Sequence, residues 1–110
     1  MMTGKGKPPA VGRWLDFDTI NRAALASLPA LLRCWLPDGR LVGLEYTARN
    51  PTRADRWPGS FRINVNSGRW ADFATGDKGG DVVSLAAYLS GTGQAEAARA
   101  LGDILGVRHV

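Results

Sequence analysis

The segment from residue 60 to residue 66 alternates strictly between apolar and polar side chains, and no other pattern in the chain constrains the fold as strongly. Its alternating positions are Phe61, Arg62, Ile63, Asn64, Val65 and Asn66. Successive side chains of a β-strand point to opposite faces, so we predict a half-buried strand with its apolar members facing the core. Residues 66–68, Asn-Ser-Gly, have turn composition, and residues 69–73 are predicted to return as a second antiparallel strand.

Beyond these strands, the apolar spacing changes to that of helices. Asp81 is placed to cap a helix over residues 82–89, which the Gly-Thr-Gly sequence at residues 91–93 is expected to end. A last helix is predicted over residues 94–105. Its inward-facing side chains are expected to be Ala97, Ala98, Leu101, Ile104 and Leu105.

Helical spacing also runs through residues 20–35, with Asp18 or Thr19 as the predicted cap. Pro29 lies inside this run, so we predict two short helices or one kinked helix rather than a straight one. Cys34 falls in the same apolar stretch and is predicted to lie in the core.

A hairpin is predicted after this helical segment. Residues 36–40, Leu-Pro-Asp-Gly-Arg, have the composition of a tight turn, and residues 41–47 have strand composition. We expect the turn at residues 36–40 to pair Trp35 with the strand over residues 41–47. Residues 49–59 carry Asn-Pro and Trp-Pro-Gly sequences and are expected to form a loop.

Together these elements predict the α+β class, with a small antiparallel β-sheet flanked by an N-terminal helical segment and two C-terminal helices. A chain of 110 residues suits one domain with one core, and we assign residues 13–110 to it. Residues 1–12 contain lysines and prolines among glycines. Such a composition buries too little apolar area to offset chain entropy, so these residues are predicted to form a flexible basic arm.

The chain has one cysteine, Cys34, and one histidine, His109. One cysteine cannot form an internal disulfide, and a structural zinc site needs about four Cys or His ligands. A histidine next to the chain end makes a poor catalytic base. We therefore expect no metal, no cofactor and no catalytic residue. No apolar run reaches the roughly 20 residues that span a bilayer and residues 1–7 lack a signal-peptide pattern, so a cytoplasmic protein without membrane contact is expected.

Positive charge is concentrated in the middle of the chain. The formal net charge is +4, and the basic residues between positions 40 and 69 are all arginines, opposed only by Glu45 and Asp55. A guanidinium group matches phosphate and stacks on bases, which favours nucleic-acid binding over a merely solvated surface. The arginines expected to gather on one sheet face are Arg49, Arg53, Arg56, Arg62 and Arg69. Trp57, followed by Tyr46, is the candidate for stacking on bases, although a tryptophan is more often a core residue.

Glycines at residues 76–80 precede the helix that Asp81 caps, an arrangement that can hold a phosphate. Asp77 and Asp81 would repel an anion there, so a structural turn with a helix cap is the favoured interpretation. Asp72, Asp77 and Asp81 could also form a divalent-cation cluster, but two of them lie in or beside the loop. Polarity of the hairpin and helix capping are the favoured roles of these carboxylates.

Three stretches in the second half of the chain occur in a characteristic order. They are Ser60-Phe61-Arg62-Ile63, then Trp70-Ala71-Asp72-Phe73-Ala74-Thr75-Gly76-Asp77-Lys78-Gly79-Gly80-Asp81, then Glu96-Ala97-Ala98-Arg99 with Leu105-Gly106-Val107. In order and spacing they resemble the zinc-binding domain that precedes bacterial and phage primases, over about half of the chain. The resemblance implies a zinc-ribbon-like sheet that contacts template DNA.

The chain departs from that family at the metal site. Asp72 and Thr75 stand where the family has a Cys-x-x-Cys pair, so the resemblance implies a metal-free, zinc-ribbon-like domain. Zinc supplies on the order of 10 kcal/mol of folding free energy in isolated fingers, and apolar packing must replace it here. At least two aromatic side chains are predicted to pack where the metal would lie. The candidates are Trp57, Phe61, Trp70 and Phe73.

Two functions follow as hypotheses. The first is a nucleic-acid-binding module, for single-stranded or primer-template DNA, that serves a phage- or plasmid-type replication primase beside a polymerase, primase or helicase that supplies the catalysis. The second is a small protein-interaction module or inhibitor from a mobile element, in which the same arginines bind carboxylates of a protein partner. Neither hypothesis makes this chain an enzyme.

Overall fold

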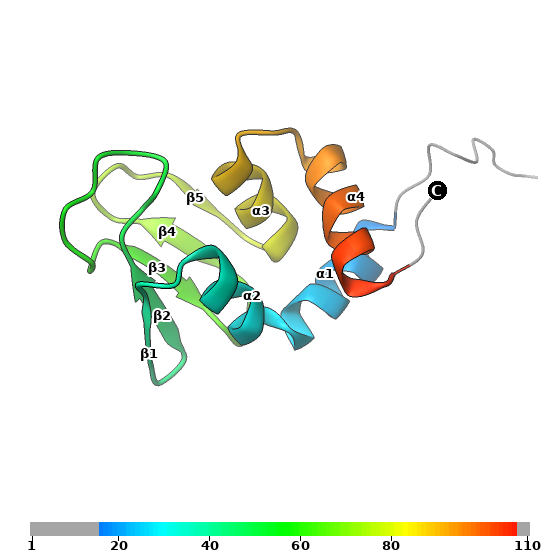
Figure 1. The fold of residues 1–110 in the computed structure, drawn as a ribbon, viewed down its shortest axis with the longest axis horizontal. Coiled ribbons are helices and arrows are strands. Elements are labelled where there is room, and N and C mark those ends of the chain that lie inside the picture. Colours follow the sequence, from blue (N-terminus) through cyan, green and yellow to red (C-terminus); the bar gives the residue numbers. More distant parts are fainter. Residues whose placement is uncertain (1–15, 108–110) are drawn as a thin grey trace, which may run out of the picture.

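The computed structural model describes residues 16–107, which fold into helices and one five-stranded antiparallel sheet (Figure 1). The elements are α1 (Phe17–Ala26), α2 (Leu28–Trp35), β1 (Arg40–Val42), β2 (Glu45–Ala48), β3 (Phe61–Asn64), β4 (Trp70–Asp72), β5 (Lys78–Gly79), α3 (Val82–Ser90) and α4 (Gln94–Leu105). This architecture confirms the predicted α+β class. Residues 1–15 and 108–110, which include the predicted arm, the start of the assigned domain and His109, lie outside the described residues.

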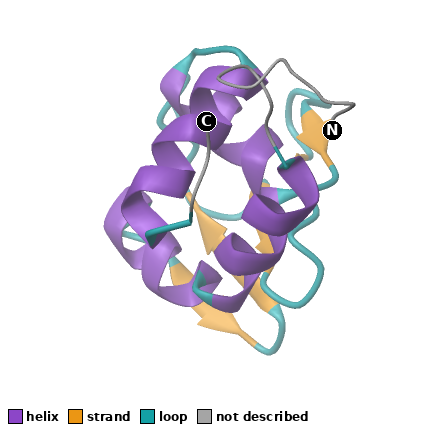
Figure 2. Ribbon diagram, turned by 90° about the vertical axis from the view of Figure 1, so that its right-hand side faces the viewer, coloured by secondary structure: helices purple, strands orange, loops and turns teal. Residues whose placement is uncertain are grey.

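The five strands follow one another across the sheet in chain order, each antiparallel to its neighbours. The helices lie on one side of the sheet, in front of the strands in Figure 2. Their apolar side chains form one core with the inner face of the sheet, including Ile20 of α1, Leu32 of α2 and Leu85 of α3. The opposite face of the sheet carries no helix among the described residues.

The alternation of residues 60–66 orients β3 as predicted. Phe61 and Ile63 are fully buried, Arg62 is exposed, and Val65 packs against the core while half-buried. The turn after β3 uses Gly68 at a φ of 80°, a backbone conformation that favours glycine.

The C-terminal helices begin and end where the sequence predicts. Asp81 caps α3 through a capping box with Ser84, and Gly91 ends it in the left-handed conformation. Helix α4 covers residues 94–105 as expected, and its buried residues include Ala97, Ala98 and Leu101. The prediction for Ile104 is wrong, because this side chain is exposed at the rim of a groove between α3 and α4.

The N-terminal segment forms two helices, and Pro29 lies in the first turn of α2, where its missing N–H costs no helical hydrogen bond. The cap of α1 is Asp16 rather than Asp18 or Thr19, since the Asp16 carboxylate accepts hydrogen bonds from both the backbone N–H and the hydroxyl of Thr19. Cys34 is exposed, contrary to prediction, because α2 buries the face that carries Leu28, Leu31 and Leu32.

The predicted hairpin about residues 36–40 is wrong in position. Trp35 belongs to α2, and the turn at residues 36–39 joins that helix to β1. The hairpin forms instead between β1 and β2, where Gly43 supplies a φ of 61°. Residues 78–79, expected within a loop, form the edge strand β5. Within residues 16–107, no helix has the length and hydropathy needed to cross a membrane.

Candidate nucleic-acid interface

The register of the sheet aligns one residue from each strand in a row across the uncovered face. Arg40 lies opposite Thr47, Thr47 opposite Arg62, Arg62 opposite Ala71, and Ala71 opposite Lys78. Directly paired residues of antiparallel strands project to the same face, so these five side chains share one face. We call this set the transverse row.

Cations and small residues alternate along the transverse row. Neighbouring strands lie about 4.8 Å apart, which places the cations of β1, β3 and β5 at intervals of roughly 10 Å. Arg40, Arg62 and Lys78 are exposed, whereas Thr47 and Ala71 between them are half-buried. The row therefore presents positive charges that are separated by small, half-buried side chains.

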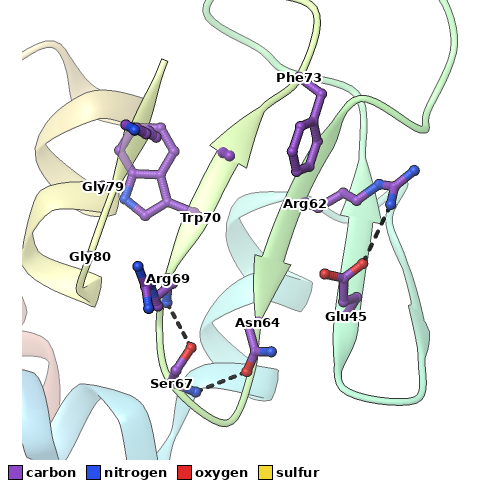
Figure 3. Close-up of a pocket in the computed structure, with 11 residues that line it drawn as sticks. Glu45, Arg62, Asn64, Ser67, Arg69, Trp70, Phe73, Gly79 and Gly80 are labelled. Atoms are coloured by element: carbon purple, nitrogen blue, oxygen red, sulfur yellow. Dashed lines mark hydrogen bonds and ion pairs between the residues drawn. The ribbon is translucent and has the colours of Figure 1, made fainter. Parts of the chain in front are cut away.

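A shallow hollow of about 570 Å³ lies on the same face (Figure 3). Its lining residues are Glu45, Arg62, Asn64, Ser67, Arg69, Trp70, Ala71, Phe73, Lys78, Gly79 and Gly80. The lining combines three cations, one carboxylate, two polar side chains and an exposed aromatic ring. Such a surface offers both charge and a stacking plane to a ligand.

Arg62 and Phe73 lie side by side on this face, as Figure 3 shows. The guanidinium carbon of Arg62 is 5.4 Å from the centre of the Phe73 ring, within cation–π range. Arg62 Nε donates a hydrogen bond to the carbonyl oxygen of Gly59 at 2.8 Å, and its ion pair with Glu45 is longer, at 3.7 Å. These contacts orient the guanidinium beside an aromatic face while it stays exposed to solvent.

Six exposed cations have no carboxylate within ion-pair distance among residues 16–107. They are Arg22, Arg33, Arg40, Arg56, Arg69 and Lys78. Arg40, Arg69 and Lys78 belong to the uncovered sheet face, Arg56 lies in the loop after β2, and the other two lie on α1 and α2. Unpaired exposed cations are available to bind phosphate without first breaking an internal ion pair.

The structure therefore divides the predicted arginines. Arg62 and Arg69 lie on the uncovered face as expected, and Arg56 is exposed. Arg49 is half-exposed, and its Nε is paired with Asp38 at 2.9 Å, which lowers the pKa of that carboxyl below its usual value. Arg53 is oriented toward the interior, so the expectation that pairing gathers all five on one face is wrong.

Arg53 belongs to a buried polar cluster. Its Nε donates to Oδ2 of Asp72 at 2.8 Å, its second guanidinium nitrogen donates to Ser60 Oγ at 2.9 Å, and it also pairs with Asp55 at 3.2 Å. The side chain of Asn50 donates to the same Asp72 oxygen at 2.8 Å. We call Asn50, Arg53, Asp55 and Asp72 the loop clasp.

The clasp keeps the Asp72 carboxylate charged although it is fully buried. Burial alone would raise the pKa of Asp72, but hydrogen bonds from Arg53, Asn50 and the backbone N–H of Ala74 outweigh it and hold the pKa well below its usual value. The same hydrogen bond to Asp72 raises the pKa of Arg53. A buried ion pair with its remaining hydrogen bonds satisfied is the form in which such a pair is tolerated.

The clasp ties the loop over residues 49–60 to β4. Asn50 also donates to the hydroxyl of Tyr88 on α3 at 2.8 Å, and that hydroxyl donates to Asp77 at 2.7 Å. The loop is thus anchored to both the sheet and a helix, while Arg56 and Trp57 near its outer end remain exposed.

The aromatic residues, like the arginines, divide into a buried group and an exposed group. Phe61 and Trp70 are buried in edge-to-face contact with ring centres 6.2 Å apart, and Tyr88 packs 4.6 Å from Trp70. Two of the four candidate aromatics, Phe61 and Trp70, are therefore core residues, and their packing at the position of a family metal site stays a prediction. Trp57 is 77% exposed and Phe73 is 70% exposed.

Of the two predicted stacking residues, the structure leaves one accessible. Trp57 is exposed in the loop, whereas Tyr46 is 4% exposed and donates its hydroxyl to the carbonyl oxygen of Leu36 at 2.6 Å. Burial raises the pKa of Tyr46. Tyr46 is a core residue that holds the turn between α2 and β1, and its assignment to a binding surface is wrong.

Sequence reasoning missed Arg40, Lys78 and Phe73 on the uncovered face. Arg40 was assigned to a turn and Lys78 to a loop, so neither was placed on a strand. Strand β1 has only 3 residues and β5 only 2, so neither is long enough for its sequence pattern to predict a strand or its pairing register. Phe73 was considered only as one of four candidates to pack where a metal would lie.

The glycine segment has the structural role that the sequence favoured. Asp81 accepts the Ser84 N–H at the start of α3 at 2.8 Å, and Asp77 accepts the Tyr88 hydroxyl. Within residues 16–107, no group of three or more His, Cys, Asp or Glu side chains is arranged to hold a metal ion. Comparison of the chain with models of known protein families, curated proteins and solved structures found no match.

Proposed function

We propose that this protein binds nucleic acid through the uncovered face of its sheet. The observation that carries the proposal is the transverse row, in which Arg40, Arg62 and Lys78 share one face with the unpaired Arg69 and the exposed ring of Phe73. Nucleic-acid backbones are recognised by such cations, and the affinity they provide falls with salt.

Single-stranded nucleic acid is the ligand that can contact both the exposed aromatic rings and the cations. Phe73 and Trp57 present aromatic rings to solvent, and a base can stack on such a ring only when it is not paired in a duplex. The face is built from short strands and holds only a shallow hollow, whereas reading a duplex groove requires a projecting helix or ribbon. Exposed rings beside spaced cations favour unpaired bases with their phosphates.

We further propose a role in DNA replication, which the sequence resemblance to primase zinc-binding domains supports. In that proposal the chain is a metal-free accessory module that holds single-stranded or primer-template DNA, and a primase, polymerase or helicase performs the reaction. In the same proposal Asp72, which stands where the resembling family has a cysteine, joins two segments through Arg53 and Asn50 without a metal.

A fluorescence-anisotropy titration tests the proposal. Labelled single-stranded and duplex oligonucleotides of equal length are titrated with the protein at two salt concentrations. Contacts from three or four cations predict a slope of about −2 to −3 for log affinity against log salt on single strands, with weaker duplex binding. If micromolar protein shows no salt-sensitive binding to either, the proposal is wrong. The same surface would then have to serve an acidic protein partner.

A further inference from the structure

The hairpin of β1 and β2 concentrates exposed apolar surface at one edge of the sheet. Leu41 is 46% exposed, Val42 67% and Leu44 55%, and each residue of β1 is exposed. Within residues 16–107 the other exposed large hydrophobic side chains are dispersed over the helices and loops. Isolated exposed apolar residues are ordinary, but three within four positions of one hairpin indicate a contact surface.

The edge formed by β1 is short but otherwise little protected. Proteins block edge strands with short length, charged side chains, prolines, bulges or a covering helix. β1 has 3 residues, paired with β2 throughout, and one charge at Arg40, but no bulge and no proline. Figure 1 shows β1 at the far edge of the sheet with no described element beyond it. The opposite edge, β5, has only 2 residues and lies beside α3.

An unpaired strand edge presents backbone N–H and C=O groups, so its chemical complement is another extended strand. We propose that the partner is a second copy of this chain, which pairs antiparallel with β1 through a twofold axis at Leu41. In this register Leu41 lies opposite Leu41 of the second copy, and Arg40 lies opposite Val42. Equal charges do not face each other, and the exposed side chains of Leu41 and Val42 in both copies are covered.

The twofold pairing keeps the uncovered faces of the two sheets on the same side. The two transverse rows then form one surface with Arg40 of each copy near its centre. The pairing segment is only 3 residues long, which buries far less than the roughly 1,000 Å² of a stable interface. The dimer is therefore weak and reversible, in the range of high micromolar protein.

Register-specific cross-linking tests the pairing. In a Cys34→Ser background, Leu41→Cys places two thiols at directly opposed positions, where Cα atoms lie about 5 Å apart and a disulfide fits. Arg40→Cys is the matched control. Each cysteine then lies opposite Val42 of the second copy, so the Cα atoms of the two cysteines are roughly 8 Å apart, too far for a disulfide. Under glutathione redox buffer, we expect a covalent dimer from Leu41→Cys and monomer from Arg40→Cys. Equal cross-linking of both variants, or none of either, overturns the proposal.

Sedimentation equilibrium provides an independent measurement without a new cysteine. Val42 faces Arg40 of the second copy in two symmetric pairs. Val42→Glu is therefore expected to lower the dissociation constant of the dimer, and Val42→Lys to raise it, each by roughly threefold to tenfold. Val42 is exposed but lies opposite Glu45 in its own hairpin, so urea unfolding of both variants is measured to check that β1 stays paired with β2. Ala95→Glu on α4 is the control for net charge, because Ala95 is exposed and far from β1. A protein that remains strictly monomeric at about 0.5 mM, near the upper end of weak association, overturns the proposal.

Discussion

The Nε atom of Arg53 lies 2.8 Å from Oδ2 of Asp72, a carboxylate with no exposed surface. This contact joins residues 19 positions apart in the sequence and holds the loop after β2 against β4. An arginine that composition assigns to a binding surface is therefore part of the internal structure. Arg56 and Trp57 belong to the same loop and are exposed.

Loss of the Asp72 charge in the loop clasp should destabilise the fold more than loss of an exposed charge. Asp72→Asn removes the buried carboxylate of a pair whose arginine side chain is 28% exposed and also contacts Asp55, and we expect it to lower the free energy of unfolding by about 1 to 3 kcal/mol. Asp38→Asn removes the exposed pair with Arg49 and should cost less than about 1 kcal/mol. Urea unfolding followed by circular dichroism measures both values. Similar losses in the two variants would contradict a special role of the clasp.

The depressed pKa of Asp72 predicts a loss of stability in acid. An aspartate in an unfolded chain has a pKa of about 3.9, and the folded value lies well below it. As the pH falls, Asp72 is therefore protonated in the unfolded chain before it is protonated in the folded protein. Its contribution to the free energy of unfolding is complete above about pH 4 and decreases as the pH drops further. The free energy of unfolding measured from pH 5 to pH 2 should fall less steeply in Asp72→Asn than in the wild type. Parallel curves would show that other carboxylates, such as Asp16 and Asp38, account for the acid sensitivity.

Neutralising unpaired cations of the sheet face should weaken single-strand binding in a salt-dependent way. The double variant Arg69→Gln, Lys78→Gln removes up to two phosphate contacts, so the magnitude of the salt slope on single strands should fall by up to about 1.4. Arg33→Gln is the control, because Arg33 is exposed on α2, on the helical side of the molecule. Anisotropy titrations over a series of salt concentrations give the slopes. If Arg33→Gln has the same effect, the binding surface lies elsewhere.

Phe73 should contribute to the binding of unpaired bases. Phe73→Ala is expected to weaken binding to single strands by roughly 1 to 3 kcal/mol, the range for one base stacked on an aromatic ring. Because Phe73 is exposed, unfolding should be little affected. Phe73→Trp, which retains an aromatic plane, is expected to preserve affinity. A loss of duplex and single-strand affinity in equal measure would exclude stacking as the cause.

Tyr46 should behave as a core residue. Tyr46→Phe removes the hydroxyl that donates to the Leu36 carbonyl oxygen and leaves that acceptor buried, at an expected cost of about 1 kcal/mol. Affinity for single strands should not change. Thermal unfolding and an anisotropy titration of the same preparation measure the two quantities. A weaker affinity with unchanged stability would return Tyr46 to the binding surface.

Short-range patterns determined the elements whose signals are local. The alternation of residues 61–64 set the strand and its buried face, Asp81 set the start of α3, and the length of α4 followed from its apolar spacing. Each depends on backbone geometry and on side chains within a few positions, which the sequence displays directly.

Tertiary structure decided the hairpin and the site. Residues 36–40 and residues 43–44 both favour turns, and the burial of Tyr46 and Leu36 against α2 selects the second for the hairpin. Whether an arginine binds a ligand or an internal carboxylate depends on the partner that folding brings to it. Arg53 meets Asp72, whereas Arg69 meets none among the described residues. The transverse row exists only through the register of five strands, because residues far apart in the chain share a face only when pairing aligns them.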